Sequence, residues 1–116
     1  MDGVHLKNAA VFKAFCDEIR LMVLSLLRDG ERCACDLLEW VPVGQSTLSH
    51  HMKILVESGV VAARRDGKWI YYSISREGSE GALKLLRELT AVVGEENLDK
   101  EECCAWARKL IPLQRH

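Results

Sequence analysis

Five cysteines are the side chains of this 116-residue chain that are best suited to chemistry. Four of them form two close pairs, Cys33 with Cys35 and Cys103 with Cys104, and Cys16 stands alone. Thiolates select soft or borderline ions; a pyramidal site of three sulfurs suits trivalent arsenic, whereas zinc and cadmium ask for four ligands. The sequence therefore predicts a thiolate site for a metal or metalloid at Cys33 and Cys35, completed by Cys103 or Cys104.

The spacing of Cys33 and Cys35 sets a condition on that site. On a regular helix, side chains at i and i+2 point about 200° apart, so both sulfurs reach one ion only where the helix start is frayed or unwound. We expect this helix to begin between Glu31 and Cys35 and to end near Trp40, and ligand binding to distort it. Ligation within one chain and across a dimer are both open, and the four paired cysteines would equally make a tetrahedral site.

Other roles for the cysteines also fit the pattern. Cys103 suits a buried position on an apolar helix face, and Cys16 suits a helix junction as well as a ligand role. Oxidation of either pair would make a thiol redox sensor, and Arg32 beside Cys33 would favour its thiolate. No Cys-x-x-Cys motif, phosphate-binding glycine loop or catalytic triad is present, so no enzyme is expected.

Bulk composition indicates one domain in a reducing compartment. The length and the 48% hydrophobic content suit a single modest core. The first residues do not resemble a signal peptide, and no apolar stretch approaches membrane-spanning length. We therefore expect a cytoplasmic protein with no membrane partner, in which clustered cysteines bind metals or react more often than they form structural disulfides.

Positive charge is concentrated in one segment, although the net charge is −1. Residues 44–76 contain five Lys or Arg against two Asp or Glu, a local charge of +3 that leaves −4 for the rest of the chain. A basic segment of this kind suits contact with nucleic-acid phosphates.

The apolar spacing before this segment predicts three helices. A short helix is expected over 6–15, and a second carries the stripe Ile19, Val23, Leu26 and Leu27 before Asp29-Gly30 stops it. The third helix is broken at 41–44, because the residue before proline resists helical geometry. A short break followed by another helix is typical of a helix-turn-helix.

The fourth helix, over 45–57, has two different faces. Its apolar stripe is Leu48, Met52, Leu55 and Val56. Polar side chains near its N-terminal half suit base edges in the major groove, and a lysine further along suits phosphate. The predicted base contacts are Gln45, Ser46, Thr47, Ser49 and His50, and the predicted phosphate contact is Lys53.

A hairpin follows the fourth helix. Two β-prone runs, 60–65 and 68–74, are joined by Asp66-Gly67, a strong hairpin signal because both turn positions are expected to need positive φ. Arg64, Arg65 and Lys68 near its tip would neutralise DNA phosphates. The predicted fold is mainly α with a small β-hairpin, a dimeric winged helix-turn-helix.

Two further helices complete the expected organisation. Residues 77–93 form an amphipathic helix with more apolar surface than so small a core needs, and a last helix begins near Asp99 and runs to about Ile111. We divide the chain into a DNA-binding and dimerisation domain at 1–94 and a helical extension at 95–116 that carries Cys103 and Cys104.

Three motifs in this order resemble the ArsR/SmtB family of metal-responsive repressors, and most closely its arsenic-sensing members. The motifs are Glu31-Arg32-Cys33-Ala34-Cys35-Asp36-Leu37, Gln45-Ser46-Thr47-Leu48-Ser49-His50-His51-Met52 and Asp66-Gly67-Lys68-Trp69-Ile70-Tyr71-Tyr72. The resemblance implies a homodimer, joined by its first and last long helices, that represses metal-resistance genes by binding double-stranded operator DNA. It also implies release when an inducer binds, with no cofactor needed for DNA binding.

The chain departs from one version of the family pattern, which places a third cysteine where Leu38 stands here. This departure makes the pair Cys103 and Cys104 the alternative source of a third sulfur. The zinc-sensing version uses Asp and His on the last long helix, and residues 77–94 contain no His. The expected inducer is trivalent arsenic; the alternatives are cadmium, lead or thiol oxidation on the same scaffold.

Overall fold

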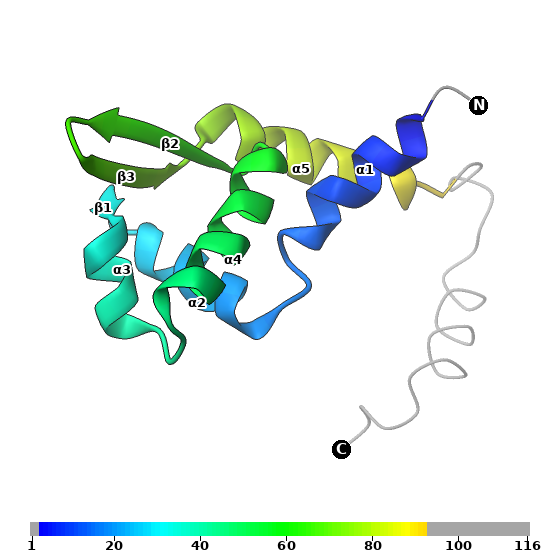
Figure 1. Ribbon diagram of the computed structural model, residues 1–116. Helices are drawn as coiled ribbons and strands as arrows, with labels where there is room; N and C mark the ends of the chain where they lie inside the picture. Colours follow the sequence, from blue (N-terminus) through cyan, green and yellow to red (C-terminus); the bar gives the residue numbers. More distant parts are fainter. Residues whose placement is uncertain (1–2, 93–116) are drawn as a thin grey trace, which may run out of the picture.

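Five helices and a small sheet make up the part of the chain that the structure, a computed structural model, describes, residues 3–92. Figure 1 shows the strands β2 and β3 projecting at one end, above β1 and α3, with α1 and α5 side by side at the other end. The elements are α1 (Val4–Lys13), α2 (Glu18–Leu27), β1 (Arg32–Cys33), α3 (Ala34–Trp40), α4 (Gln45–Glu57), β2 (Val61–Asp66), β3 (Trp69–Ile74) and α5 (Arg76–Leu89). The predicted fold class, mainly helical with a winged helix-turn-helix, is confirmed.

The core lies between α2, α3 and α4. Val23, Leu37 and Leu55 are completely buried there, and Leu48 and Met52 are nearly so. The predicted stripes are therefore correct in their centres, while Ile19, Leu26 and Val56 at their margins are only partly buried around that core. Burial of these side chains fixes α4 against the body of the protein, and its opposite face remains exposed.

The helix-turn-helix has the predicted boundaries. Helix α3 ends at Trp40, and α4 begins at Gln45 after a four-residue connection. Val41 has extended backbone at the end of α3 and is buried, which anchors the connection before Pro42. The short connection restricts the angle between α3 and α4.

The wing is the hairpin of β2 and β3, and its turn differs from the prediction. Asp66 pairs with Trp69 inside the ladder, so the two turn residues are Gly67 and Lys68. Among the described residues only glycines have positive φ, and Gly67 has φ 62°. The expectation of two positive φ values at Asp66-Gly67 was wrong, because a glycine at the first central position is sufficient, as in type II′ turns.

A third strand, which the sequence prediction missed, completes the sheet in the order β1-β3-β2. Arg32 pairs with Tyr72, and Cys33 pairs with Tyr71. Arg32 and Cys33 are thus extended, and α3 begins at Ala34, within the range 31–35 in which its start was predicted. Two residues are too short to give a strand signal in a sequence, and the partner strand creates this one.

Helix α5 packs its first turn closely against the loop after α4. Ser75 caps it by accepting a hydrogen bond from the backbone N–H of Gly78. The predicted helix 77–93 is therefore confirmed in type, with observed bounds of 76–89. The predicted helix near 99–111 and the domain boundary at 94 lie outside the described residues, and no described helix is long and apolar enough to cross a membrane.

Candidate thiolate site and nucleic-acid interface

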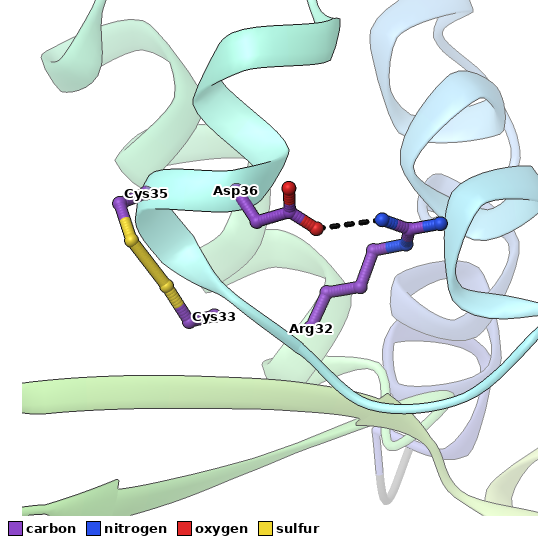
Figure 2. The surroundings of a disulfide bond; sticks show 4 residues. All are labelled: Arg32, Cys33, Cys35 and Asp36. Carbon is purple, nitrogen blue, oxygen red and sulfur yellow. Dashed lines mark hydrogen bonds and ion pairs between the residues drawn. A yellow bond between two sulfur atoms is a disulfide. The ribbon is translucent and has the colours of Figure 1, made fainter.

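Cys33 and Cys35 meet at the junction of β1 and α3. Cys33 is the extended residue that precedes the helix, with φ −80° and ψ 156°, and Cys35 is the second helical residue. Their Cα atoms are 5.5 Å apart, and the two sulfur atoms are joined as a disulfide (Figure 2). The extended backbone at Cys33 removes the divergence of side chains that a regular helix would impose, so the two sulfurs lie together.

An ion pair secures the other side of this junction. Arg32 Nη1 lies 2.6 Å from Asp36 Oδ2, and Arg32 Nε donates a 2.8 Å hydrogen bond to the carbonyl of Leu26 in α2. Figure 2 shows the Arg32–Asp36 pair on the side of α3 away from the sulfur atoms. The segment that carries the cysteines is thus tied to both α2 and α3.

Beside Cys33 and Cys35, the described residues of a single chain offer no third ligand. Within residues 3–92, no group of three Cys, His, Asp or Glu side chains could hold a metal ion. Cys16 is a free, exposed thiol in the bend between α1 and α2, in keeping with a helix junction. Cys103 and Cys104 lie outside the described residues, so their expected part in the site remains a prediction.

The N-terminal half of α4 presents a polar surface to solvent. All the α4 side chains predicted to contact DNA are exposed: Gln45, Ser46, Thr47, Ser49 and His50 in this half, and Lys53 further along the helix. Donors and acceptors on one exposed face of a second helix suit the major groove of DNA. We refer to α4 as the reading helix from here on.

His51, next to His50 in the sequence, has a different role. It is 9% exposed, and its Nδ1 lies 2.8 Å from Arg20 Nη1 of α2, which is itself 8% exposed. Arg20 Nε also donates a 3.0 Å hydrogen bond to the carbonyl of Lys13, at the end of α1. This buried polar pair ties the reading helix to α1 and α2, and a signal for it was present in Arg20, a charged residue three before Val23 of the apolar stripe.

Asp17 joins this junction as the N-cap of α2. Its carboxylate accepts hydrogen bonds from the backbone N–H groups of Ile19 at 2.8 Å and Arg20 at 3.3 Å, and it lies 3.7 Å from His51 Nδ1. Desolvation opposes ionisation, but these N–H groups and the nearby Arg20 and His51 together lower the pKa of Asp17.

The wing arginines are not equivalent. Arg64 forms a two-point ion pair with Glu31, with Nη2 2.6 Å from Oε1 and Nε 3.0 Å from Oε2, and its guanidinium carbon lies 4.6 Å from the centre of the Tyr71 ring. The hydrogen bonds between them lower the pKa of Glu31 and raise that of Arg64. Arg65 forms no ion pair with the described residues, and Lys68 lies over the Trp69 ring at 5.3 Å.

A groove of about 370 Å³ connects the cysteine segment with the reading surface. It lies between α3, the reading helix and β3, and Cys35 lines it together with Gln45, Ser49 and Lys68. A group bound at Cys35 would therefore stand beside side chains predicted to contact DNA.

Known proteins share this architecture and sequence. Residues 17–63 match the family described as "Bacterial regulatory protein, arsR family". An uncharacterized HTH-type transcriptional regulator of Methanocaldococcus jannaschii is 42% identical over 84 residues, which cover 72% of this chain and 94% of that protein. The arsenical resistance operon repressor of Bacillus subtilis is 35% identical over 94 residues, covering 80% of this chain and 86% of that repressor. The chain belongs to the ArsR family.

Solved structures agree with this assignment. A crystal structure titled as a possible transcriptional regulator for arsenical resistance aligns with a TM-score of 0.63 and 26% identity, over 69% of this chain and 83% of that one. As a member of the ArsR family, the chain is a DNA-binding transcriptional regulator.

Proposed function

We propose that this ArsR-family regulator represses transcription as an operator-bound homodimer and is released when trivalent arsenic binds its cysteine thiolates. One observation carries the proposal: the sulfurs of Cys33 and Cys35 meet where α3 begins, and Cys35 lines one groove with Gln45 and Ser49 of the reading helix. A relative of 35% identity is named as an arsenical resistance operon repressor, which supports the same inducer.

DNA binding would use the exposed face of the reading helix. Two copies related by the dimer axis would enter successive major grooves, so the half-sites would lie about one helical turn apart. Gln45, Ser46, Thr47, Ser49 and His50 would contact base edges, and Lys53, Arg65 and Lys68 would contact phosphates. Arg64 would reach phosphate only by leaving Glu31.

Dimerisation would bury the apolar face of α5. Leu83, Leu86 and Leu89 of α5, and Val92 shortly after its end, are between 48% and 57% exposed in the single chain. Helix α1 lies beside α5 and adds Leu6, which is 79% exposed. Helices at the end away from the wing would thus join two copies and leave both reading helices accessible (Figure 1).

Arsenic ligation requires the thiols rather than the disulfide. Arsenite would lose hydroxyl groups as water, each As–O bond giving way to an As–S bond with a thiol supplying the proton. Cys33 and Cys35 would provide two sulfurs, and Cys103 or Cys104, from the same chain or the partner, would provide the third. The pyramidal ligation would pull on the start of α3 and favour a conformation with lower operator affinity, typically by about 1–3 kcal/mol of coupling.

Thiol oxidation is a second candidate for the signal, because Cys33 and Cys35 are joined as a disulfide. Two thiols and one peroxide molecule would give this disulfide and two water molecules. Cadmium would instead use all four paired cysteines as ligands, and lead is a further candidate inducer.

A titration of the operator complex separates these inducers. A duplex selected from random DNA by the reduced protein would be labelled, and its fluorescence anisotropy followed during addition of arsenite, cadmium, lead or peroxide. Release at the lowest concentration by arsenite supports the proposal. Release by cadmium alone would indicate a four-sulfur site, release by lead alone would indicate a lead sensor, and release by peroxide alone would indicate a redox sensor.

A further inference from the structure

Three side chains form one row across the sheet, from the cysteine segment to the wing. Cys33 of β1 pairs with Tyr71 of β3, and Tyr71 pairs with Arg64 of β2. Directly paired residues of an antiparallel sheet project from the same face. The Cys33 sulfur, the Tyr71 ring and the Arg64 guanidinium therefore follow one another on one face of the sheet.

Glu31 connects the Arg64 end of this row back to the cysteine segment. It lies two residues before Cys33, and its carboxylate binds the Arg64 guanidinium at two points, 2.6 and 3.0 Å. Arg64 lies over the Tyr71 ring, 4.6 Å from its centre, and so extends back across β3 toward β1. Glu31, Tyr71 and Arg64, which we call the wing clamp, bind the outer strand of the wing to the segment immediately before the cysteines.

Arg65 lies on the other face of the same strand. Its pairing partner is Ile70, and Ile70 and Tyr72 line the groove beside Ser49 and Met52 of the reading helix. Because side chains alternate along a strand, Arg65 belongs to the face toward the reading helix, and Arg64 belongs to the face with Tyr71. Arg64 and Arg65 both line a hollow with Ser49 and Lys53 of the reading helix, but their side chains project from opposite faces of β2.

We propose that Arg64 is a positioning residue rather than a DNA contact: the wing clamp makes the position of the wing depend on the cysteine segment. A change of backbone at Cys33 would shift Glu31, and Glu31 would draw Arg64 and strand β2 with it. Arg65 would carry the phosphate contact of β2. The role in signalling rests on the proposed arsenic response, whereas the division of labour between the two arginines does not.

The test compares Arg64→Gln with Arg65→Gln, a matched pair on one exposed strand. For each variant and the wild type, the affinity for the selected duplex is measured across a potassium chloride series, and unfolding is followed to verify the fold. Each lost phosphate contact reduces the slope of log affinity against log salt by about 0.9. Because the dimer carries two copies of Arg65, we expect the slope to fall by about 1.8 in Arg65→Gln and to stay unchanged in Arg64→Gln.

Arsenite addition then tests the coupling in the same variants. In Arg64→Gln and Glu31→Gln the ratio of operator affinities without and with arsenite should fall roughly 2- to 30-fold below the wild-type ratio. Arg65→Gln should keep the wild-type ratio.

Two results would overturn the inference: a slope reduced in Arg64→Gln as much as in Arg65→Gln, or an arsenite effect in Arg64→Gln and Glu31→Gln equal to the wild-type effect. A wild type that ignores arsenite would refute the proposed inducer instead. The salt slopes would still decide whether Arg64 contacts DNA.

Discussion

Cys33 is the last residue of β1 and the residue immediately before α3. This position determines whether its sulfur atom can reach that of Cys35. Its backbone is extended because it pairs with Tyr71, and its side chain therefore turns toward Cys35 of the first helical turn. The two sulfurs would diverge if α3 began two residues earlier. The sheet register is thus the physical reason that the sulfur atoms of Cys33 and Cys35 lie together.

His50 and His51 are expected to have different roles: the buried His51 stabilises the fold, and the exposed His50 contacts DNA. We expect His51→Ala to lower the free energy of unfolding by about 1–3 kcal/mol, because the buried Arg20 guanidinium loses a hydrogen-bond partner. Chemical denaturation monitored by circular dichroism measures this loss.

His50→Ala is the matched control. His50 is exposed, so its removal should change unfolding by no more than about 0.5 kcal/mol and should weaken operator binding instead. Equal stability of the two variants would contradict the assignment of His51 to the interior.

At the level of single residues, the sequence predicted correctly which side chains are buried or exposed where this follows from the periodicity of a helix. The exposed polar face of the reading helix follows from its apolar stripe at Leu48, Met52 and Leu55. Glu31 and His51 were not predicted to have partners, because their contacts with Arg64 and Arg20 join residues 33 and 31 positions apart. Spacing along one element contains no information about such long-range pairs.

At the scale of elements, the local sequence was sufficient to predict the helices, whereas contacts with other elements determine at which residues they begin and end. Glycine, proline and apolar spacing predicted α2, α3, α4 and the wing. The strand β1 could not be predicted, because two residues become a strand only when β3 lies beside them. The same contact delays the start of α3 to Ala34.

The cap of α2 should make the stability of the protein depend on acid pH. The pKa of Asp17 is lowered in the folded state, so its contribution is present above its ordinary pKa near 3.8 and is lost as pH falls through the lower folded value. Asp17→Asn should therefore be less stable than the wild type at neutral pH, and the difference should shrink as pH decreases below about 3.8. Urea unfolding at several pH values measures both curves, and a difference independent of pH would contradict this account.

Helix α5 meets the loop after α4 at a glycine. A Cβ atom at Gly78 would overlap the backbone carbonyl of Gly59, so Gly78→Ala must displace the helix and should cost about 1–3 kcal/mol of unfolding free energy. A thermal or urea unfolding curve gives the value.

Gly81→Ala, three residues later in the same helix, provides the comparison. A Cβ there has no neighbour within 4 Å outside the local helix, and alanine should stabilise the helix by about 0.5–1 kcal/mol. A stable Gly78→Ala protein would show that α5 does not pack as described.

At the scale of the whole molecule, the apolar side chains of α5 explain why one chain is not expected to act alone. Leu86→Glu should convert the proposed dimer into monomers, because a carboxylate would have to be buried in the interface. Sedimentation velocity at micromolar protein measures the state, and Lys84→Glu, on an exposed position of α5, should stay dimeric. A dimeric Leu86→Glu protein would place the interface elsewhere.

The central claim links two neighbouring elements of the helix-turn-helix: a ligand on Cys33 and Cys35, at the start of α3, controls the reading helix. The most direct measurement is the anisotropy of the operator complex of the reduced protein during arsenite titration, for the wild type and for Cys33→Ser with Cys35→Ser. We predict that arsenite releases wild-type protein and that the double variant stays bound, while Cys16→Ser behaves as wild type. Release of the double variant at the same arsenite concentration would contradict the account.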